Sequence, residues 1–401
     1  MGPSDPTSIR VSPPPLLDTA MRALFLLLSA CSGLPALEVV PEAPPHTPGL
    51  AAALPEGVLR LEDQLEPIRA EAGVPALGAV IVDRTGLRAV GTVGMLHTGE
   101  DAGPIADNSP WHMGSNGKSI TALVIARLVE RGALSFDTRV GDHLADLSIH
   151  PDWHPVTLDQ LLHHTGGVHA NSGRLQAFWL QRAPYVSQPR AARRALLSAQ
   201  LEDRPQTEPG STYLYSNLGY TLAGAVAEAA TDTPWETLVV QEVLDPLELQ
   251  SAGFGAPEGD AAPWGHHILG AMPPGPTADN PPAISPAGTL HMALVDQAQL
   301  TRLHLTKGAS KPGYLTAESW QRLHEPGLDD YAMGWEIQER GWSGGPFWTH
   351  DGSNTMWYAR SLFAPGIDRG LVVVSNQGPP SGAEAVRTAE KVLRTWPLDG
   401  D

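Results

Sequence analysis

β-Rich segments stand at both ends of the folded part of this chain, and this arrangement limits the folds open to it. Residues 76–94 (ALGAVIVDRTGLRAVGTVG) hold two β-rich runs about a polar, glycine-containing turn, which predicts a hairpin. Residues 348–352, 356–366 and 369–378 are typical of three antiparallel strands. Between the two ends, residues 141–250 have mostly helical spacing broken by Pro and Gly. The pattern predicts an α/β (α+β) fold, in which an antiparallel sheet is flanked by helices and carries an inserted all-helical lobe.

The folded domain is expected to begin and end with a helix. The first helix ends at Gly73, and the last is an amphipathic helix over residues 381–396. Residues 255–288 are rich in Pro and Gly and are expected to form a structureless loop, and a loop of this length in a compact domain is usually functional. The predicted domain covers residues 55–397, with an α/β part at 55–135 and 289–397 and a helical lobe with the long loop at 136–288.

The N-terminal residues are typical of an export signal. Arg22 precedes a short apolar run that is followed by small residues, which predicts a secretory signal peptide over residues 1–31. The run is far shorter than the roughly 20 residues that a membrane-spanning helix needs. Leu-Ser-Ala-Cys, ending at Cys31, resembles the cleavage box of bacterial lipoproteins, in which the cysteine is lipidated. The alternative is a plain signal peptide with a chance cysteine, and Met21 is an alternative start to Met1.

The lipoprotein interpretation carries a prediction of location. Residues 32–54 are Pro-rich and would act as a tether between membrane and domain. The protein is therefore expected to be exported and lipid-anchored in the cell envelope of a bacterium, with the anchor as its only contact with a membrane. Cys31 is the only cysteine, so an internal disulfide is impossible and a redox role is disfavoured.

Charge and motif content exclude several function classes. The formal net charge is -18, and no basic stripe is present to bind phosphates, so a nucleic-acid partner is not expected. The chain has 15 His, including His163-His164 and His266-His267, but no H-E-x-x-H motif and no cysteine pair, so neither a metal nor another cofactor is expected. These histidines are expected at polar surfaces or in loops. A G-x-S-x-G elbow and a P-loop signature are also absent.

A buried-looking helix over residues 112–134 opens with an unusual pair of side chains. Ser115 and Lys118 lie three residues apart and therefore share one helical face. A lysine whose pKa is lowered by burial can take the proton of a serine hydroxyl and make it a nucleophile. The helix N-terminus adds backbone N–H groups suited to a developing oxyanion. The alternative is an N-capping serine with a lysine that snorkels to solvent.

Two further motifs follow in order. Tyr215-x-Asn217 precedes a helix, and His350-x-Gly352 lies on a predicted strand. Ser-x-x-Lys, Tyr-x-Asn and Lys/His-x-Gly in this order resemble the motif set of the penicillin-recognising serine hydrolases. The Tyr-x-Asn form is similar to class C β-lactamases and their esterase, D-aminopeptidase and DD-carboxypeptidase-like relatives. The resemblance covers residues 55–396, includes the segment LDQLLHHTGGV, and implies a β-lactamase/DD-peptidase-like fold. Without it, Tyr215 and Asn217 would form an ordinary turn before a helix.

The resemblance implies a role for each residue of the first two motifs. Ser115 would be the nucleophile, and Lys118 with Tyr215 would be the general base and acid pair. Tyr215 would be the base in deacylation, which requires that the nearby Lys118 lower the pKa of its phenol. Asn217 would hydrogen-bond the substrate and orient Lys118.

The same resemblance implies a substrate-binding set. The backbone N–H groups of Ser115 and Ser353 would form the oxyanion hole, and Gly352 would let the substrate approach the strand closely. Asn171 matches a substrate-contacting amide of class C enzymes.

His350 departs from the β-lactamase pattern, which carries lysine at this position. Histidine is mostly neutral near pH 7, and His350 is expected to become protonated toward pH 5.5. We therefore expect a serine hydrolase that forms an acyl-enzyme with small-molecule esters, amides or peptides. A class C-like β-lactamase, a penicillin-binding sensor and a non-catalytic scaffold of the same fold remain as alternatives.

Overall fold

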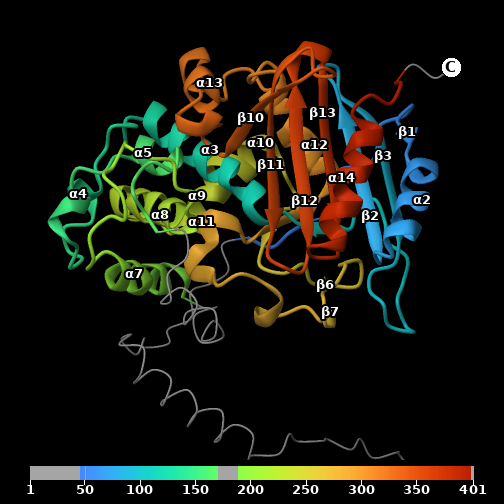
Figure 1. The fold of residues 1–401 in the computed structure, drawn as a ribbon, viewed down its shortest axis with the longest axis horizontal. Coiled ribbons are helices and arrows are strands. Elements are labelled where there is room, and N and C mark those ends of the chain that lie inside the picture. Colours follow the sequence, from blue (N-terminus) through green and yellow to red (C-terminus); the bar gives the residue numbers. More distant parts are fainter. Residues whose placement is uncertain (1–45, 50, 170–187, 399–401) are drawn as a thin grey trace, which may run out of the picture. The chain divides into compact units, whose positions relative to one another are not determined.

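The computed structural model describes residues 46–49, 51–169 and 188–398, which all belong to one compact unit (Figure 1). Cys31 and Asn171, and with them the predicted signal peptide, lie outside the described residues. Within the described ranges, every helix is too short or too polar to cross a membrane.

The centre of the fold is an eight-stranded sheet in which the two ends of the domain meet. The hairpin of β2 (Ala76–Val82) and β3 (Leu87–Gly94) confirms the predicted hairpin, and β11 (Gly345–Ser353), β12 (Tyr358–Ala364) and β13 (Arg369–Ser375) confirm the three predicted strands. Strand β13 joins the two sets by pairing antiparallel with β2. The short β1 pairs parallel with β3, which is an exception to the predicted antiparallel pattern. The strands lie in the order β1 (Leu59–Arg60), β3 (Leu87–Gly94), β2 (Ala76–Val82), β13 (Arg369–Ser375), β12 (Tyr358–Ala364), β11 (Gly345–Ser353), β10 (Trp335–Arg340) and β9 (Tyr331–Ala332).

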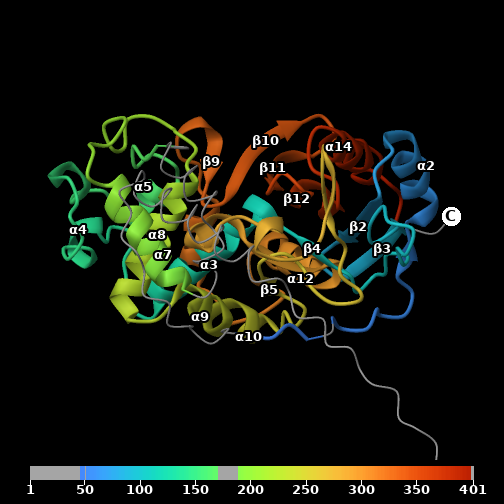
Figure 2. The same cartoon turned by 90° about the horizontal axis from the view of Figure 1, so that it is seen from below.

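Helices cover both faces of the sheet, which explains why β2 is apolar and buried along its whole length. Figure 2 shows α14 (Ser381–Leu393) and α2 (Glu62–Ala72) on one side of the strands and α12 (Leu294–Leu305) on the other. Successive side chains of a strand point to opposite faces. Leu77 and Ile81 accordingly pack against α2 and α14, whereas Val80 and Val82 pack in the cluster that contains residues of α12.

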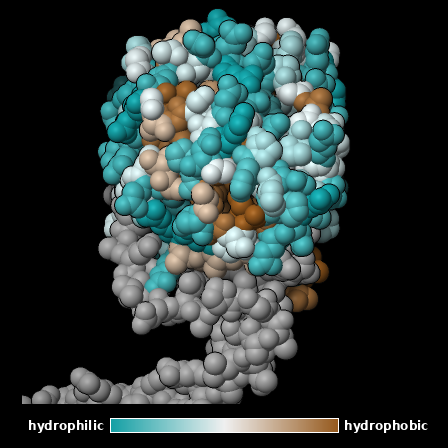
Figure 3. Space-filling view, turned by 90° about the vertical axis from the view of Figure 1, so that its left-hand side faces the viewer, coloured by the Kyte–Doolittle hydropathy of each residue, from teal (hydrophilic) through white to brown (hydrophobic). Residues whose placement is uncertain are grey.

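The helical lobe lies beside the sheet and is formed mainly by the middle of the chain (Figure 1). Its helices α7 (Pro189–Gln200), α8 (Asn217–Thr231) and α9 (Trp235–Val239) are linked by the fully buried Arg193 of α7, which pairs with Glu228 of α8 and with Glu236 of α9. The outer face of the lobe is mainly hydrophilic, with small apolar patches (Figure 3). The α-helices described are α2 (Glu62–Ala72), α3 (Gly117–Glu130), α4 (Val140–His143), α5 (Leu158–Leu162), α7 (Pro189–Gln200), α8 (Asn217–Thr231), α9 (Trp235–Val239), α10 (Asp245–Leu247), α11 (Ser285–Gly288), α12 (Leu294–Leu305), α13 (Ala317–His324) and α14 (Ser381–Leu393).

The expectation of a structureless loop at 255–288 is wrong. The segment contains the hairpin β6 (Gly265–His267) and β7 (Gly270–Met272), two 3₁₀ turns and α11. Next to it lies a three-stranded sheet of β4 (Pro110–His112), β8 (Leu290–Ala293) and β5 (Gly253–Phe254). These elements are too short to show a period in the sequence, and the strands of the small sheet pair with partners far away in the chain.

One boundary also differs from the predictions, and two strands were missed. The first helix begins at Glu62 because Leu59 and Arg60 pair with β3 instead of joining the helix. The helix ends as predicted, with Gly73 in the left-handed conformation. Strands β9 and β10 were not predicted from the sequence.

Candidate active site

Ser115 lies on a 3₁₀ turn, η1 (Gly114–Asn116), that leads directly into α3. Helix α3 is buried on almost every side, and Lys118 in its first turn has no exposed surface. The alternative in which Lys118 snorkels to solvent is therefore wrong. Ser115 does not cap the helix either, because the N-cap residue of α3 is Asn116 and no side chain caps it.

The amine of Lys118 has three oxygen neighbours. Its Nζ lies 2.7 Å from Oδ1 of Asn217, 2.9 Å from the carbonyl oxygen of Ala287 and 3.0 Å from Oγ of Ser115. Burial lowers the pKa of Lys118 well below its usual value, which favours the neutral amine. A neutral amine has two N–H groups and one lone pair. Because the two carbonyl-type oxygens can only accept, they take both N–H groups, and the lone pair is left facing the Ser115 hydroxyl.

Tyr215 reaches the same place from the turn that precedes α8. Ser216 caps this helix by accepting a hydrogen bond from the backbone N–H of Gly219 at 3.1 Å, and Lys118 Nζ lies 4.8 Å from the centre of the Tyr215 ring. Burial raises the pKa of Tyr215, although a hydrogen bond with the Ser115 side chain acts in the opposite direction. The expectation that Lys118 lowers the pKa of Tyr215 is wrong, since burial also disfavours the charge of the lysine.

His164 supports the Tyr215 turn and was not assigned a role from the sequence. Its Nδ1 accepts the backbone N–H of Ser216 at 3.1 Å, and its carbonyl oxygen accepts that of Leu214 at 2.8 Å. Its ring centre lies 4.4 Å from that of Tyr215. The residue has a φ of 58°, which is strained for a side chain of this size. The segment LDQLLHHTGGV was a signal for this position.

The paired histidines were expected at polar surfaces or in loops. His163 and His164 do lie in a turn after α5, but they are not at the surface, and His266 lies on the buried strand β6. His163, His164 and His266 are buried, and burial lowers the pKa of His164 well below its usual value. Each of the three has a hydrogen-bond partner for a ring nitrogen: Asp159 O for His163, Ser216 N for His164 and Asn376 O for His266. A neutral histidine can pack in a core when one ring nitrogen is hydrogen-bonded, and spacing alone does not reveal this.

His350 faces the same centre from β11. Its Nδ1–H donates to the carbonyl oxygen of Asp351 at 2.7 Å, and its Nε2 accepts from the hydroxyl of Tyr331 at 3.3 Å. Burial lowers the pKa of His350 to about 4. The expected protonation toward pH 5.5 is therefore wrong, and the imidazole is neutral across the range in which most hydrolases work.

The strand β11 and the turn η1 meet backbone to backbone. A Cβ on Gly352 would lie 2.0 Å from the carbonyl oxygen of Met113 and 3.0 Å from the N of Ser115. A Cβ on Gly114, which has a φ of 52°, would lie 2.3 Å from the N of Ser353. Only glycine fits at either position. This close approach of the two backbones brings the amides of Ser115 and Ser353 near each other, which is a condition for the predicted oxyanion hole.

The structure thus assembles all the predicted site residues that it describes. Ser115, Lys118, Tyr215, Asn217 and His350 come from three distant segments and surround one amine and one hydroxyl. In the described ranges, no group of three or more His, Cys, Asp or Glu side chains is placed to hold a metal ion.

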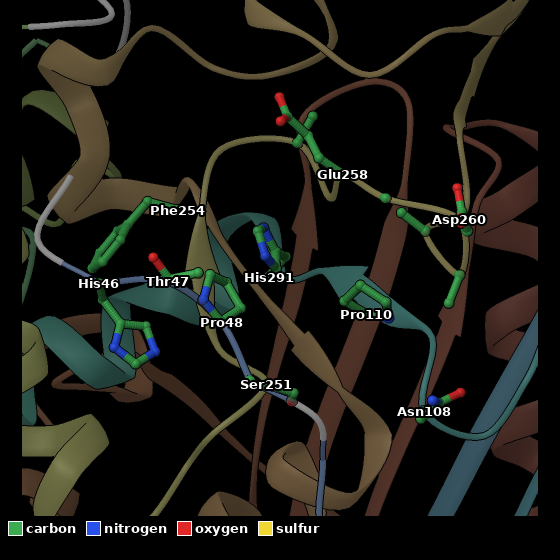
Figure 4. Close-up of a pocket in the computed structure, with 15 residues that line it drawn as sticks. His46, Thr47, Pro48, Asn108, Pro110, Ser251, Phe254, Glu258, Asp260 and His291 are labelled. Carbon is green, nitrogen blue, oxygen red and sulfur yellow. The ribbon is translucent and has the colours of Figure 1, made fainter.

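A separate cavity lies between residues 46–49 and the β5–β8 edge of the small sheet (Figure 4). Its volume is about 620 Å³, and Glu258 and Asp260 give its wall acidic groups. None of the predicted site residues lines it.

Comparisons with known proteins agree with this arrangement. A family model described as Beta-lactamase matches residues 61–394. Penicillin-binding protein 4 of Amycolatopsis lactamdurans is 25% identical over 345 residues, covering 79% of this chain and 84% of that protein. The octameric penicillin-binding protein homologue from Pyrococcus abyssi has a TM-score of 0.70 at 22% identity, covering 84% of this chain and 78% of its own. A D-stereospecific amidohydrolase from Streptomyces sp. has a TM-score of 0.65 at 20% identity, covering 82% and 97%. The two structural likenesses concern the fold.

Proposed function

The chain belongs to the Beta-lactamase family and is a serine hydrolase, and from this premise we propose that it acts through an acyl-enzyme on esters or peptide-like amides. The observation that carries the proposal is the environment of Lys118. A buried amine with two acceptors and one hydroxyl around it is poised to take a proton from that hydroxyl.

The first half-reaction is acylation. Ser115 Oγ attacks the carbonyl carbon of the substrate while its proton passes to Lys118 Nζ. The tetrahedral oxyanion is bound by the N–H groups of Ser115 and Ser353. As the intermediate collapses, the bond to the leaving group breaks and the leaving group takes up a proton. Tyr215, whose raised pKa keeps its phenol protonated, relays this proton from Lys118.

The second half-reaction is deacylation by water. Lys118 is neutral again after it has given up the proton, so it can accept a proton from water through the Tyr215 hydroxyl. Water then attacks the acyl carbonyl, and Ser115 leaves with the proton restored to it. In this scheme Tyr215 moves protons but does not need to exist as a phenolate, which its burial disfavours.

The substrate class follows from the absence of positive charge on His350. A neutral imidazole bonded to Tyr331 offers little attraction to a substrate carboxylate, so neutral esters and amides are favoured over carboxylated β-lactams. The name of the Amycolatopsis relative supports a second candidate, a penicillin-binding protein that is acylated but turns over slowly.

An activity screen tests the proposal. The full chain should hydrolyse p-nitrophenyl esters or D-amino-acid p-nitroanilides faster than nitrocefin, and a fluorophosphonate probe should add one label at Ser115. Ser115→Ala should lose both properties, whereas Ser135→Ala, which changes an exposed serine beyond α3, should keep them. Labelling that survives Ser115→Ala would refute the assignment. A burst with no steady-state turnover on any substrate would favour the penicillin-binding alternative.

A further inference from the structure

A buried histidine and a buried carboxylate lie next to η1, the turn that carries Ser115 and is called the nucleophile turn below. Neither takes part in the proton transfers above. His112 ends β4, two residues before Gly114, and Asp279 lies in the segment 255–288. The two side chains are buried, with 1% and 6% exposed surface, and His112 Nε2 lies 2.5 Å from Asp279 Oδ1.

The other nitrogen of His112 binds the backbone of the nucleophile turn. Its Nδ1 accepts the N–H of Gly114 at 3.0 Å. This requires the neutral tautomer with the proton on Nε2, and Asp279 selects that tautomer by accepting the Nε2–H. Gly114 needs such a restraint because it has a left-handed φ of 52° and glycine moves easily between backbone conformations. Gly288 packs closely against the carbonyl group of Gly114, since a Cβ at position 288 would lie 2.6 Å from the Gly114 oxygen.

The same pair contacts the loop after β11, which follows Ser353. Asn354 donates to Asp279 Oδ1 at 3.5 Å and to the carbonyl oxygen of Ala278 at 3.2 Å. The Trp357 ring stacks on His112 with 5.4 Å between ring centres, and the carbonyl oxygen of Trp357 accepts the Ser353 hydroxyl at 2.6 Å. The backbone segments that supply the amides of Ser115 and Ser353 therefore both contact the same pair, His112 and Asp279.

We propose that His112 and Asp279 are positioning residues that hold the oxyanion hole in its working geometry, with Asp279 acting through the tautomer of His112. The inference rests on the proposed acyl-enzyme function. The hydrogen bonds of the pair go to Gly114 and Asn354 and not to the Ser115 hydroxyl, so its loss should act on the stabilisation of the tetrahedral intermediate and leave ground-state binding unchanged. The proposal also gives the segment 255–288 a function, because this segment places Asp279 in contact with His112.

Asparagine and leucine at position 112 form a matched test. They have nearly the same shape and leave the same space behind, but only Asn offers an oxygen to the N–H two residues later, as in an Asx turn. With p-nitrophenyl acetate, His112→Leu should lower kcat by about ten- to a hundredfold with KM unchanged, which is part of the roughly 10²–10³ that one oxyanion donor supplies. His112→Asn should stay within about threefold of wild type, because the acceptor is kept. Equal kcat values in the two variants, or a rise in KM that accounts for the loss, would overturn the proposal.

A second comparison tests whether Asp279 acts through His112. Asp279→Leu should lower kcat in the wild-type background but have little further effect in the His112→Asn background, where no tautomer is left to select. Equal losses in both backgrounds would refute this order of action. The comparison also decides the matter if His112→Leu fails to fold.

Amide hydrogen exchange separates this inference from the proposed function. Exchange in a peptide containing Gly114 should be faster in His112→Leu than in His112→Asn, and this holds whether or not the chain hydrolyses any ester. If the wild type shows no Ser115-dependent activity, the proposed function fails, while the exchange comparison still tests whether His112 and Asp279 hold the nucleophile turn. If activity is present and exchange is equal in the two variants, the positioning role of His112 and Asp279 is refuted and the proposed function is not.

Discussion

Replacing Asn217 by Asp tests whether the neutral amine of Lys118 is the base. The two side chains have the same shape, but the change places a carboxylate 2.7 Å from Lys118 Nζ. At an effective dielectric constant of about 20, a pair of unit charges at this distance gains about 6 kcal/mol. If burial of the new charge offsets two thirds of this energy, about 2 kcal/mol remains, which raises the pKa of Lys118 by roughly 1.5 units.

The sign of the effect follows from the protonation state that catalysis needs. A raised pKa keeps the amine protonated to higher pH, and an ammonium has no lone pair for the Ser115 proton. The acid limb of the kcat/KM profile of Asn217→Asp should therefore move to higher pH by at least about one unit, with activity returning in alkali. The measurement is hydrolysis of a p-nitrophenyl ester between pH 5 and 10.

The control is Asn217→Leu, which removes the Oδ1 acceptor without adding charge. It should lower kcat/KM at every pH because one N–H of Lys118 loses its partner. The acid limb of its kcat/KM profile should not move to higher pH, as that of Asn217→Asp does. If the profile of Asn217→Asp coincides in position with that of Asn217→Leu, a neutral Lys118 is not the base, and the argument from its three oxygen neighbours is wrong.

Three further predictions concern specificity, stability and location. His350→Lys should raise nitrocefin kcat/KM relative to a neutral ester by about 1–2 kcal/mol, since it adds a charged donor for the substrate carboxylate; a wild type that already prefers nitrocefin would contradict this. Burial lowers the pKa of His304 to about 3, below its unfolded value of about 6.5, so its contribution to stability is complete above pH 6.5 and is lost as the pH falls toward 3. His304→Phe should accordingly show a smaller loss of urea midpoint between pH 6.5 and 4 than wild type, and an unchanged loss would count against this view. If Cys31 is lipidated, as we propose, the exported protein should partition into detergent and Cys31→Ser should not; partitioning that persists in Cys31→Ser would exclude the anchor.

Several features could be predicted from the sequence because their causes are local. Alternating or continuous apolar runs predicted the hairpin β2–β3 and the strands β11–β13. The i, i+3 spacing of Ser115 and Lys118 predicted that their side chains meet, which they do although Ser115 lies on η1 and only Lys118 lies on α3. The order of three motifs predicted the family, because each motif carries its own residue types at its own spacing. These signals do not depend on which segments meet in space.

The state of each site residue was decided by tertiary structure. Whether Lys118 snorkels or is buried depends on α8, on α11 and on the carbonyl oxygen of Ala287, none of which is near it in the sequence. The pKa values of Tyr215 and His350 were wrongly predicted for the same reason: burial depends on the packing of distant elements, and it outweighs the influence of the nearest charge.

The roles of two residues that support the site, His164 and His112, could not be predicted from the sequence. His164 and His112 carry no spacing signal, because each acts on a backbone N–H that only the folded chain brings to its ring. The segment 255–288 looked structureless for a related reason, since its order comes from contacts with β4, η1 and the loop after β11 and not from its own periodicity. The sequence determined which chemical groups the chain carries and the family that uses them. Only the tertiary structure determined which of those groups are neutral, which are held in place and which residues hold them, because burial and hydrogen bonding between distant segments are properties of the folded chain.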